Sequence, residues 1–306
     1  MSCRSCAALS MILLGALSSP ASAAFDVLFQ DGFQFGFHVQ SPEITLASGE
    51  EATYCYYFRT PNATAFGVNR WRSHLVAGMG HVILFTTSAE QQPAGTLTTS
   101  CTLPSGGGWQ YAAYDLDEQI LFPSDDGGGT PLAAEITAGK FAVLQMYAVN
   151  ATSQPFTTSA YLSADALDPA NMYTKSAAYM TFNSNLSLPP QATSNAQLTC
   201  QAPAASKFWL LTTRTHRYAT QSKISNNGSD VVVSSDWQHP AVASFTAPNF
   251  VTFASGLTYR CDYFNPTNFT IHSGESEATD EVCMGIGYFF PADTGPKFCV
   301  NSTGPL

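Results

Sequence analysis

The chain has 306 residues, with 12 Lys and Arg against 22 Asp and Glu, and a formal net charge of −10 at pH 7. This acidity argues against nucleic acid and anionic membrane surfaces as partners, because both carry the same sign of charge. Charged residues make up only 11% of the chain, whereas Gly and Pro are plentiful. The length leaves room for two domains of ordinary size.

Residues 1–23 have the pattern of a secretory signal peptide. Arg4 supplies a positive charge, Ala7 to Leu17 is apolar, and Ala21-Ser22-Ala23 is typical of a cleavage site. The alternative is an uncleaved anchor, although this run is short for a bilayer and no later stretch is long enough to span one. The sequence therefore predicts an exported protein, secreted or periplasmic, whose mature chain begins near Ala24.

Six of the eight cysteines follow this segment. An even number of cysteines in an oxidising compartment favours three disulfides, and a free reactive thiol at Cys283 is the alternative. The absence of a CxxC pair among them disfavours a zinc ribbon, and the count alone leaves fifteen pairings open. The six are Cys55, Cys101, Cys200, Cys261, Cys283 and Cys299.

Strand signals dominate the rest of the chain. Runs rich in Val, Ile, Phe, Tyr and Thr are separated by clusters of Gly, Pro, Asn and Ser. No segment has a convincing helical period, so we expect an all-β protein built of sandwiches rather than a parallel sheet. The expected strands are Glu51–Thr60, His81–Thr87, Phe141–Asn150, Ala177–Phe182, Phe208–Thr215, Asp230–Ser235, Phe250–Phe264 and Met284–Pro291.

The composition shifts around Asp168-Pro169 and Pro189-Pro190, which bracket a single short strand. This shift predicts a boundary near residue 176, with one domain over residues 24–176 and a second over residues 177–306. No internal repeat is evident. The acidic run that contains Glu275, Glu277, Asp280 and Glu281 is expected to be a solvated loop.

Five runs, taken in order, carry a resemblance to a known family. They are Ile44–Thr60 (ITLASGEEATYCYYFRT), Gly78–Phe85 (GMGHVILF), Leu144–Pro155 (LQMYAVNATSQP), Trp209–Thr220 (WLLTTRTHRYAT) and Asp280–Ala292 (DEVCMGIGYFFPA). Together they resemble the copper type II, ascorbate-dependent mono-oxygenases, the family of peptidylglycine α-hydroxylating and dopamine β-mono-oxygenases, and in particular its bacterial members. The runs span nearly the whole mature chain, and their order is more specific than any single run.

The resemblance implies two tandem eight-stranded antiparallel jelly-roll β-sandwich domains, each with one copper ion. In this family one copper, held by three histidines, stores an electron. The other, held by a His-x-His pair and a methionine, binds dioxygen beside a substrate C–H bond, and ascorbate restores the electrons. The resemblance also implies the disulfides Cys55–Cys101, Cys200–Cys299 and Cys261–Cys283.

The first copper site of the family falls on Gly80, His81 and Tyr147, so one histidine of three remains. Loss of direct ligands weakens metal binding severely, since even changes behind the ligands typically cost about 10–100-fold in affinity. Met79, Met146 and Tyr147 are possible substitute ligands. Strict strand alternation would place Met79 on the same face as His81.

The second site falls on Arg214, His216 and Val282, so one imidazole of the His-x-His pair remains and the methionine is lost. Residues i and i+2 of a strand share a face, so the permanent cation of Arg214 lies beside this imidazole and repels a metal ion. Met284 is a possible substitute thioether, although a buried methionine is more often part of the core.

We therefore expect a copper mono-oxygenase-like protein with degenerate sites, in which His81 and His216 are remnant ligands and no residue is assigned a catalytic role. Such a protein would act as a binding or structural module, with a small molecule or a protein as its partner. The alternative is an active copper- and ascorbate-dependent mono-oxygenase that hydroxylates a C–H bond through substitute ligands. A carrier of a small apolar ligand between the domains is a third possibility, without positive support in the sequence.

The chain contains six Asn-x-Ser/Thr sequons, which matter only in a host that glycosylates such sites. They begin at Asn62, Asn150, Asn185, Asn227, Asn268 and Asn301.

Overall fold

The computed structural model of the chain describes residues 35–101 and 108–301, and the predicted signal peptide lies outside them. These residues form strands and loops and contain no helix, so the all-β prediction is confirmed. Within the same ranges, no helix exists that could serve as a membrane span.

Residues 35–175 supply thirteen of the described strands. They are β1 (Phe35–Gln40), β2 (Ile44–Leu46), β3 (Glu51–Arg59), β4 (Phe66–Leu75), β5 (Met79–Thr87), β6 (Leu97–Thr98), β7 (Gly108–Ala113), β8 (Asp117–Leu121), β9 (Leu132–Ile136), β10 (Phe141–Val149), β11 (Phe156–Thr158), β12 (Ala160–Ala166) and β13 (Thr174–Lys175). One sheet has the order β1-β12-β4-β9-β13, with β8 paired to β4, and the other has the order β6-β3-β10-β5-β7.

Residues 177–300 supply the remaining eleven. They are β14 (Ala177–Phe182), β15 (Ser187–Leu188), β16 (Ala192–Cys200), β17 (Lys207–Arg214), β18 (Ala219–Asn226), β19 (Ser229–Ser234), β20 (Val242–Ser244), β21 (Leu257–Asn265), β22 (Ile271–His272), β23 (Met284–Phe290) and β24 (Lys297–Val300). Their main sheets have the orders β20-β17-β23-β14-β24 and β16-β21-β18-β19. No sheet of the described residues combines strands from both halves.

Each half is a sandwich whose two sheets enclose an apolar core. In the first half, Trp71 on β4 and Leu144 on β10 are fully buried and belong to one cluster. In the second, Phe208 on β17 and Tyr259 on β21 do the same. Both halves have more strands than the eight expected per domain, because short strands at the sheet edges add to the longer ones.

The two halves share one topology, although no repeat is evident in the sequence. In the first half β10 lies between β3 and β5, and in the second β21 lies between β16 and β18 in the same chain order. Likewise β1-β12-β4-β9 corresponds to β14-β23-β17-β20. The order in which strands pair is therefore the same in both halves, although their amino-acid sequences show no repeat.

Identical side-chain caps at the ends of β10 and β21 support this correspondence. Asn150 donates from Nδ2 to three backbone oxygens at 2.9–3.2 Å, and Thr152 donates to the Asn150 side-chain oxygen at 2.7 Å. Asn265 and Thr267 repeat the arrangement, with donor distances of 2.9–3.1 Å and 2.7 Å. Each cap satisfies the loop carbonyls at the bottom of its sandwich.

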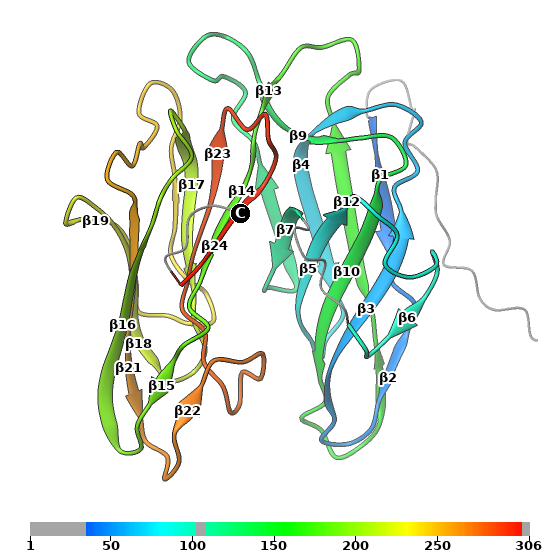
Figure 1. Cartoon of the computed structure of the whole chain (residues 1–306). Helices are drawn as coiled ribbons and strands as arrows, with labels where there is room; N and C mark the ends of the chain where they lie inside the picture. Colours follow the sequence, from blue (N-terminus) through cyan, green and yellow to red (C-terminus); the bar gives the residue numbers. More distant parts are fainter. Residues whose placement is uncertain (1–34, 102–107, 302–306) are drawn as a thin grey trace, which may run out of the picture.

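The two halves lie side by side, with β7 next to β14 at the seam (Figure 1). Their apolar packing is continuous: Phe122 of the first half lies 4.8 Å from Trp209 and 5.6 Å from Tyr288 of the second, between ring centroids. Tyr288 also donates a hydrogen bond to the Gln110 carbonyl at 2.8 Å. The seam is therefore part of the hydrophobic core rather than a solvated gap.

The six cysteines form the disulfides Cys55–Cys101, Cys200–Cys299 and Cys261–Cys283, which are the pairs that the resemblance implies. Each bridge lies within one half. A disulfide of this kind stabilises a domain by about 2–4 kcal/mol, largely through the unfolded chain.

Candidate functional site

A cavity of about 690 Å³ lies at the seam between the two halves. This volume is in the range of small-molecule sites, which are mostly apolar with a few polar groups. Both remnant histidines line it, together with side chains from both halves. The principal lining residues are His81, Ile83, Phe85, Trp109, Tyr114, Gln145, Met180, Phe182, Arg214, His216, Glu275, Val282, Met284, Lys297 and Phe298.

His81 is presented to the cavity by β5. Its ring stacks on Tyr147 of the neighbouring β10, with 5.1 Å between ring centroids and 14° between planes. The side chain is 7% exposed, and Nδ1 is buried without a hydrogen-bond partner among the described residues. Burial, followed by the positive charge of Arg214, holds the pKa of His81 well below its usual value of 6.5. The ring is therefore neutral at physiological pH.

A β-bulge at Gly80 changes which side chains lie on the same strand face as His81. In the β5–β10 pair His81 lies opposite Tyr147, whereas Met79 lies opposite Ala148, so Gly80 is the extra residue. Adjacent β10 residues point to opposite faces, and Met79 consequently points into the core, away from His81. The expectation that Met79 shares the face of His81 was wrong for this reason.

Two other substitute ligands are also excluded from His81. Met146 is fully buried in the core beside Val82, on the face opposite His81. Tyr147 keeps its hydroxyl away from the ring, because it donates to the Glu51 carboxylate at 2.6 Å. Tyr147 therefore contributes a stacking surface to His81 rather than an oxygen ligand.

Arg214, at the end of β17, is a buried cation with its own counter-ion. Its side chain is 5% exposed and forms an ion pair with Glu277. The guanidinium also donates to the Trp237 carbonyl at 3.4 Å and lies over the Tyr114 ring of the other half, 4.3 Å from the centroid. The charge of Arg214 is therefore balanced by groups within the protein, and its contact with Tyr114 links the two halves.

His216 is held in one orientation by backbone contacts. Its Nδ1 lies 3.1 Å from the Asp280 carbonyl oxygen, and its backbone N–H donates to Glu281 at 2.9 Å. Burial, followed by the Arg214 charge, lowers the pKa of His216 to about 3. A carbonyl can only accept a hydrogen bond, so the neutral ring carries its proton on Nδ1 and presents Nε2 as an acceptor.

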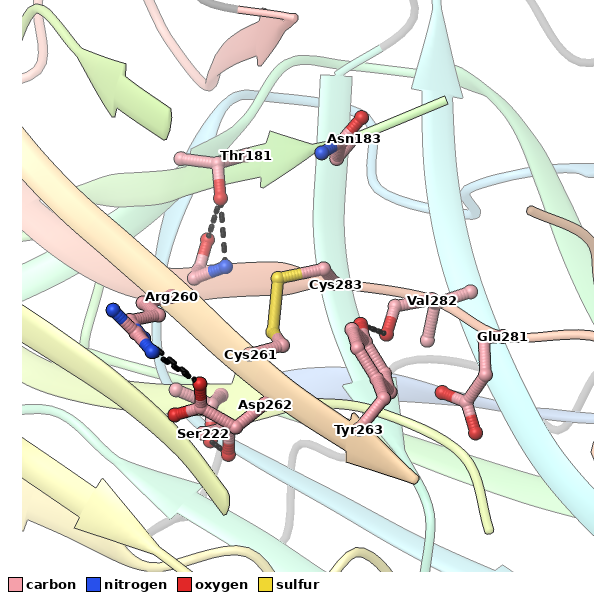
Figure 2. Close-up of a disulfide and its surroundings, with 12 residues drawn as sticks. Thr181, Asn183, Ser222, Arg260, Cys261, Asp262, Tyr263, Glu281, Val282 and Cys283 are labelled. Carbon is pink, nitrogen blue, oxygen red and sulfur yellow. Dashed lines mark hydrogen bonds and ion pairs between the residues drawn. A yellow bond between two sulfur atoms is a disulfide. The ribbon is translucent and has the colours of Figure 1, made fainter. Parts of the chain in front are cut away.

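Val282 and Met284 complete the wall on the side of the second half. Met284 lies directly opposite Arg214 in the β17–β23 pair, and both residues line the cavity. Cys283 lies between Val282 and Met284 in sequence, and Figure 2 shows its bridge to Cys261 beside Val282, whose carbonyl accepts a hydrogen bond from Tyr263 at 2.9 Å. The disulfide thus fixes the wall beside His216.

The acidic run is not the solvated loop expected from the sequence. Glu281 is fully buried and accepts backbone N–H groups of His216 and Tyr218 at 2.9 and 2.6 Å. Glu277 pairs with Arg214, as described above. Glu275 crosses to the first half, where Thr53 and Gln145 donate to it at 2.8 and 3.2 Å. This segment borders the cavity. The sequence showed that the segment is polar, but it gave no signal that three of its carboxylates have partners inside the protein.

The residues at the two copper positions that the resemblance implies do not fit copper. Among the described residues no group of three or more His, Cys, Asp or Glu side chains is arranged to hold a metal ion. A Cβ at Gly80 would lie 2.7 Å from the Tyr147 ring, so the aromatic side chain occupies the space of a missing ligand. Arg214 is close enough to lower the pKa of both remaining imidazoles. We therefore derive no reaction step through copper or ascorbate.

No protein-family model and no curated protein matches the chain. Among solved structures, the major capsid protein P2 from bacteriophage PM2 is 7% identical, covers 82% of this chain and 97% of its own, and has a TM-score of 0.37. The PBSX exported protein XepA is 11% identical, covers 82% of this chain and 86% of its own, and has a TM-score of 0.23. At identities and TM-scores this low, neither structure indicates a function for this chain.

Proposed function

We propose that the protein is a non-catalytic binding module, built on a copper mono-oxygenase-like scaffold, that holds a small molecule in the cavity between its halves. The observation that carries this proposal is the cavity itself: apolar side chains from both halves enclose about 690 Å³ around two neutral imidazoles. Three disulfides support an oxidising, extracellular or periplasmic location.

The proposal includes the loss of copper-dependent catalytic activity. Gly80, Tyr147, Arg214 and Val282 stand at four of the six ligand positions that the resemblance implies. Tyr147 and Arg214 have each acquired packing partners that a metal site would have to disrupt. Because these replacements are integrated into the fold, we infer that the cavity serves binding rather than oxygen activation.

Filling the cavity tests the proposal. Naphthalene, followed by its fluorescence, should bind the wild-type chain, and Val282→Trp should abolish binding because the indole would occupy the cavity. Val242→Trp is the matched control, since Val242 is 59% exposed on β20 and does not line the cavity. Near-UV circular dichroism confirms that both variants are folded. Equal binding by both variants, or none by the wild type, would count against the proposal.

A copper titration with metal analysis and electron paramagnetic resonance addresses the alternative of an active enzyme. We expect no pair of tight copper sites, because neither position keeps more than one of its ligands and Arg214 repels cations. Two tightly bound copper ions per chain, together with ascorbate-dependent oxygen uptake, would overturn the non-catalytic assignment. In that case His81→Ala and His216→Ala should each abolish turnover.

A further inference from the structure

The chemistry of the cavity wall narrows the class of molecule it can hold, given the proposed binding function. His216 offers an acceptor: its Nδ1–H is used by the Asp280 carbonyl, and no described residue bonds to Nε2. A ligand that displaces water from this nitrogen leaves it without a partner unless the ligand brings an O–H or N–H donor, so the acceptor favours such a ligand. Because the Nδ1 hydrogen bond holds the ring in one orientation, His216 presents its acceptor nitrogen to a ligand at a fixed position.

His81 complements this acceptor. Its Nδ1 is sealed from solvent without a partner, which leaves Nε2 as the nitrogen that faces the cavity. A bare buried N–H is rarer than an unused acceptor, so the neutral ring carries its proton on Nε2 and offers a donor. Both rings line the same cavity. One donor and one acceptor thus face the same space.

Charge in the cavity is already balanced or lies at its rim. Arg214 is paired with Glu277 inside the protein, so an anionic ligand would have to displace that carboxylate. Glu275 is exposed and Lys297 is half-buried. The remaining walls are mostly aliphatic and aromatic, with Phe85 and Trp109 in edge-to-face contact at 5.7 Å, and they include the uncharged polar side chains of Gln145, Ser184, Ser273 and Thr294. Nothing deep in the cavity calls for a charged ligand.

We propose that the cavity binds an uncharged molecule with an apolar, ring-containing body and a hydroxyl group. The hydroxyl donates to Nε2 of His216, and Nε2–H of His81 donates to the hydroxyl oxygen. A hydroxyl is the smallest group that is both donor and acceptor, and it therefore satisfies both imidazoles at once. The apolar body replaces water against the aromatic walls.

Fluorescence titrations with four probes that differ in one substituent test this inference on the purified chain. The probes are 2-naphthol, 2-methoxynaphthalene, naphthalene and 2-naphthoate. We expect 2-naphthol to bind about ten-fold more tightly than 2-methoxynaphthalene, because methylation removes the donor and leaves the His216 acceptor unpaired. The anion 2-naphthoate should bind more weakly than 2-naphthol, because Arg214 is not free to pair with it.

Substitution of the histidine identifies the group responsible. His216→Phe keeps an apolar wall, so naphthalene should still bind while the preference for 2-naphthol over 2-methoxynaphthalene falls to about one. His74→Phe is the matched control, since the His74 side chain is 61% exposed and pairs with Asp117 outside the cavity. This control should retain the full preference.

The outcomes separate the ligand class from the binding function. If naphthalene does not bind the wild type, the proposed function itself fails. If naphthalene binds but 2-naphthol is no tighter than 2-methoxynaphthalene, or 2-naphthoate is tightest, the hydroxyl inference is overturned while the binding function stands. Should His216→Phe not fold, the four-probe series on the wild type decides the question alone.

Discussion

Glu281 and His216 are neighbours whose protonation responds to burial in opposite ways. Burial raises the pKa of Glu281 to about 7, so the folded chain holds this proton more tightly than the unfolded chain. The contribution of Glu281 to stability therefore falls as the pH rises from about 4.5 to about 7. Burial lowers the pKa of His216 to about 3, so its contribution is complete above pH ~6.5 and is lost as the pH falls.

We predict that Glu281→Gln and His216→Phe change the pH profile of stability with opposite slopes. Between about pH 5 and pH 7.5, the unfolding free energy of the wild type relative to Glu281→Gln should fall by about 2 kcal/mol. Relative to His216→Phe, it should rise by about 2 kcal/mol. Urea denaturation at several pH values measures both, and parallel profiles for all three proteins would contradict the assignment.

At the residue scale, the sequence identified the residues at the ligand positions that the resemblance implies, but not what those residues contact. Arg214 was recognisable as a cation at a histidine position. Its counter-ion Glu277 is distant in sequence, in the loop between β22 and β23, and the tertiary fold rather than a local pattern brings the two together. Polar composition alone predicted a solvated segment around Glu281, because composition contains no information on which carboxylate is enclosed.

The bulge in β5 shows how one residue redirects an element. If β5 alternated regularly through Gly80 instead of bulging there, Met79 and His81 would share a face, and a thioether would stand beside the imidazole. With it, Met79 joins the core and the Tyr147 ring covers the glycine. The small side chain at position 80 and the large one at position 147 are therefore matched.

We predict that Gly80→Ala destabilises the protein by about 1–3 kcal/mol, the usual cost of overpacking, because the new methyl group would overlap the Tyr147 ring. In a Tyr147→Ala background the same substitution should cost much less. Urea denaturation of the two single variants and the double variant gives the coupling energy. Additive effects would show that the ring does not oppose a side chain at position 80.

Strand positions followed from the sequence where both faces are apolar, as in β10. They also followed for β14 and β19, each within one residue of its bounds, whereas several other strands were not expected. β16 was missed because its residues alternate between half-buried and exposed, with few apolar side chains to mark them. The strand expected from Phe250 begins only at Leu257, because a turn closed by the hydrogen bond from Gly256 to Phe253 precedes it.

At the scale of the whole molecule, the seam joins two sandwiches that each have a core of their own. The chain passes from the sheets of the first half to those of the second between β13 and β14, at Ser176. The Ser176 hydroxyl accepts a hydrogen bond from Trp209 and donates one to the Phe289 carbonyl. The repeated topology was not detectable from the sequence, since pairing order is preserved without matching residues. Phe122 of the first half packs on two aromatic rings of the second, Trp209 and Tyr288.

We predict that the wild type unfolds in one transition and that Phe122→Ala separates it into two. Removing a buried phenylalanine costs about 3–5 kcal/mol, and here the loss falls on contacts between the halves. Leu121→Ala is the matched control, because Leu121 is adjacent on β8 and 62% exposed. Differential scanning calorimetry measures the transitions, and two transitions in the wild type would refute the coupling.

The Asn150 cap has a consequence for any host that attaches glycans. Asn150 begins a sequon, yet its amide nitrogen is buried and donates to three carbonyls. A glycan on that nitrogen would replace one of its two donor hydrogens and place a sugar in a buried space, so modification and folding at this position exclude each other. Asn227 and Asn268 are exposed and accept a glycan without this conflict. Occupancy at Asn150 is thus a direct reporter of chains that were glycosylated before they folded.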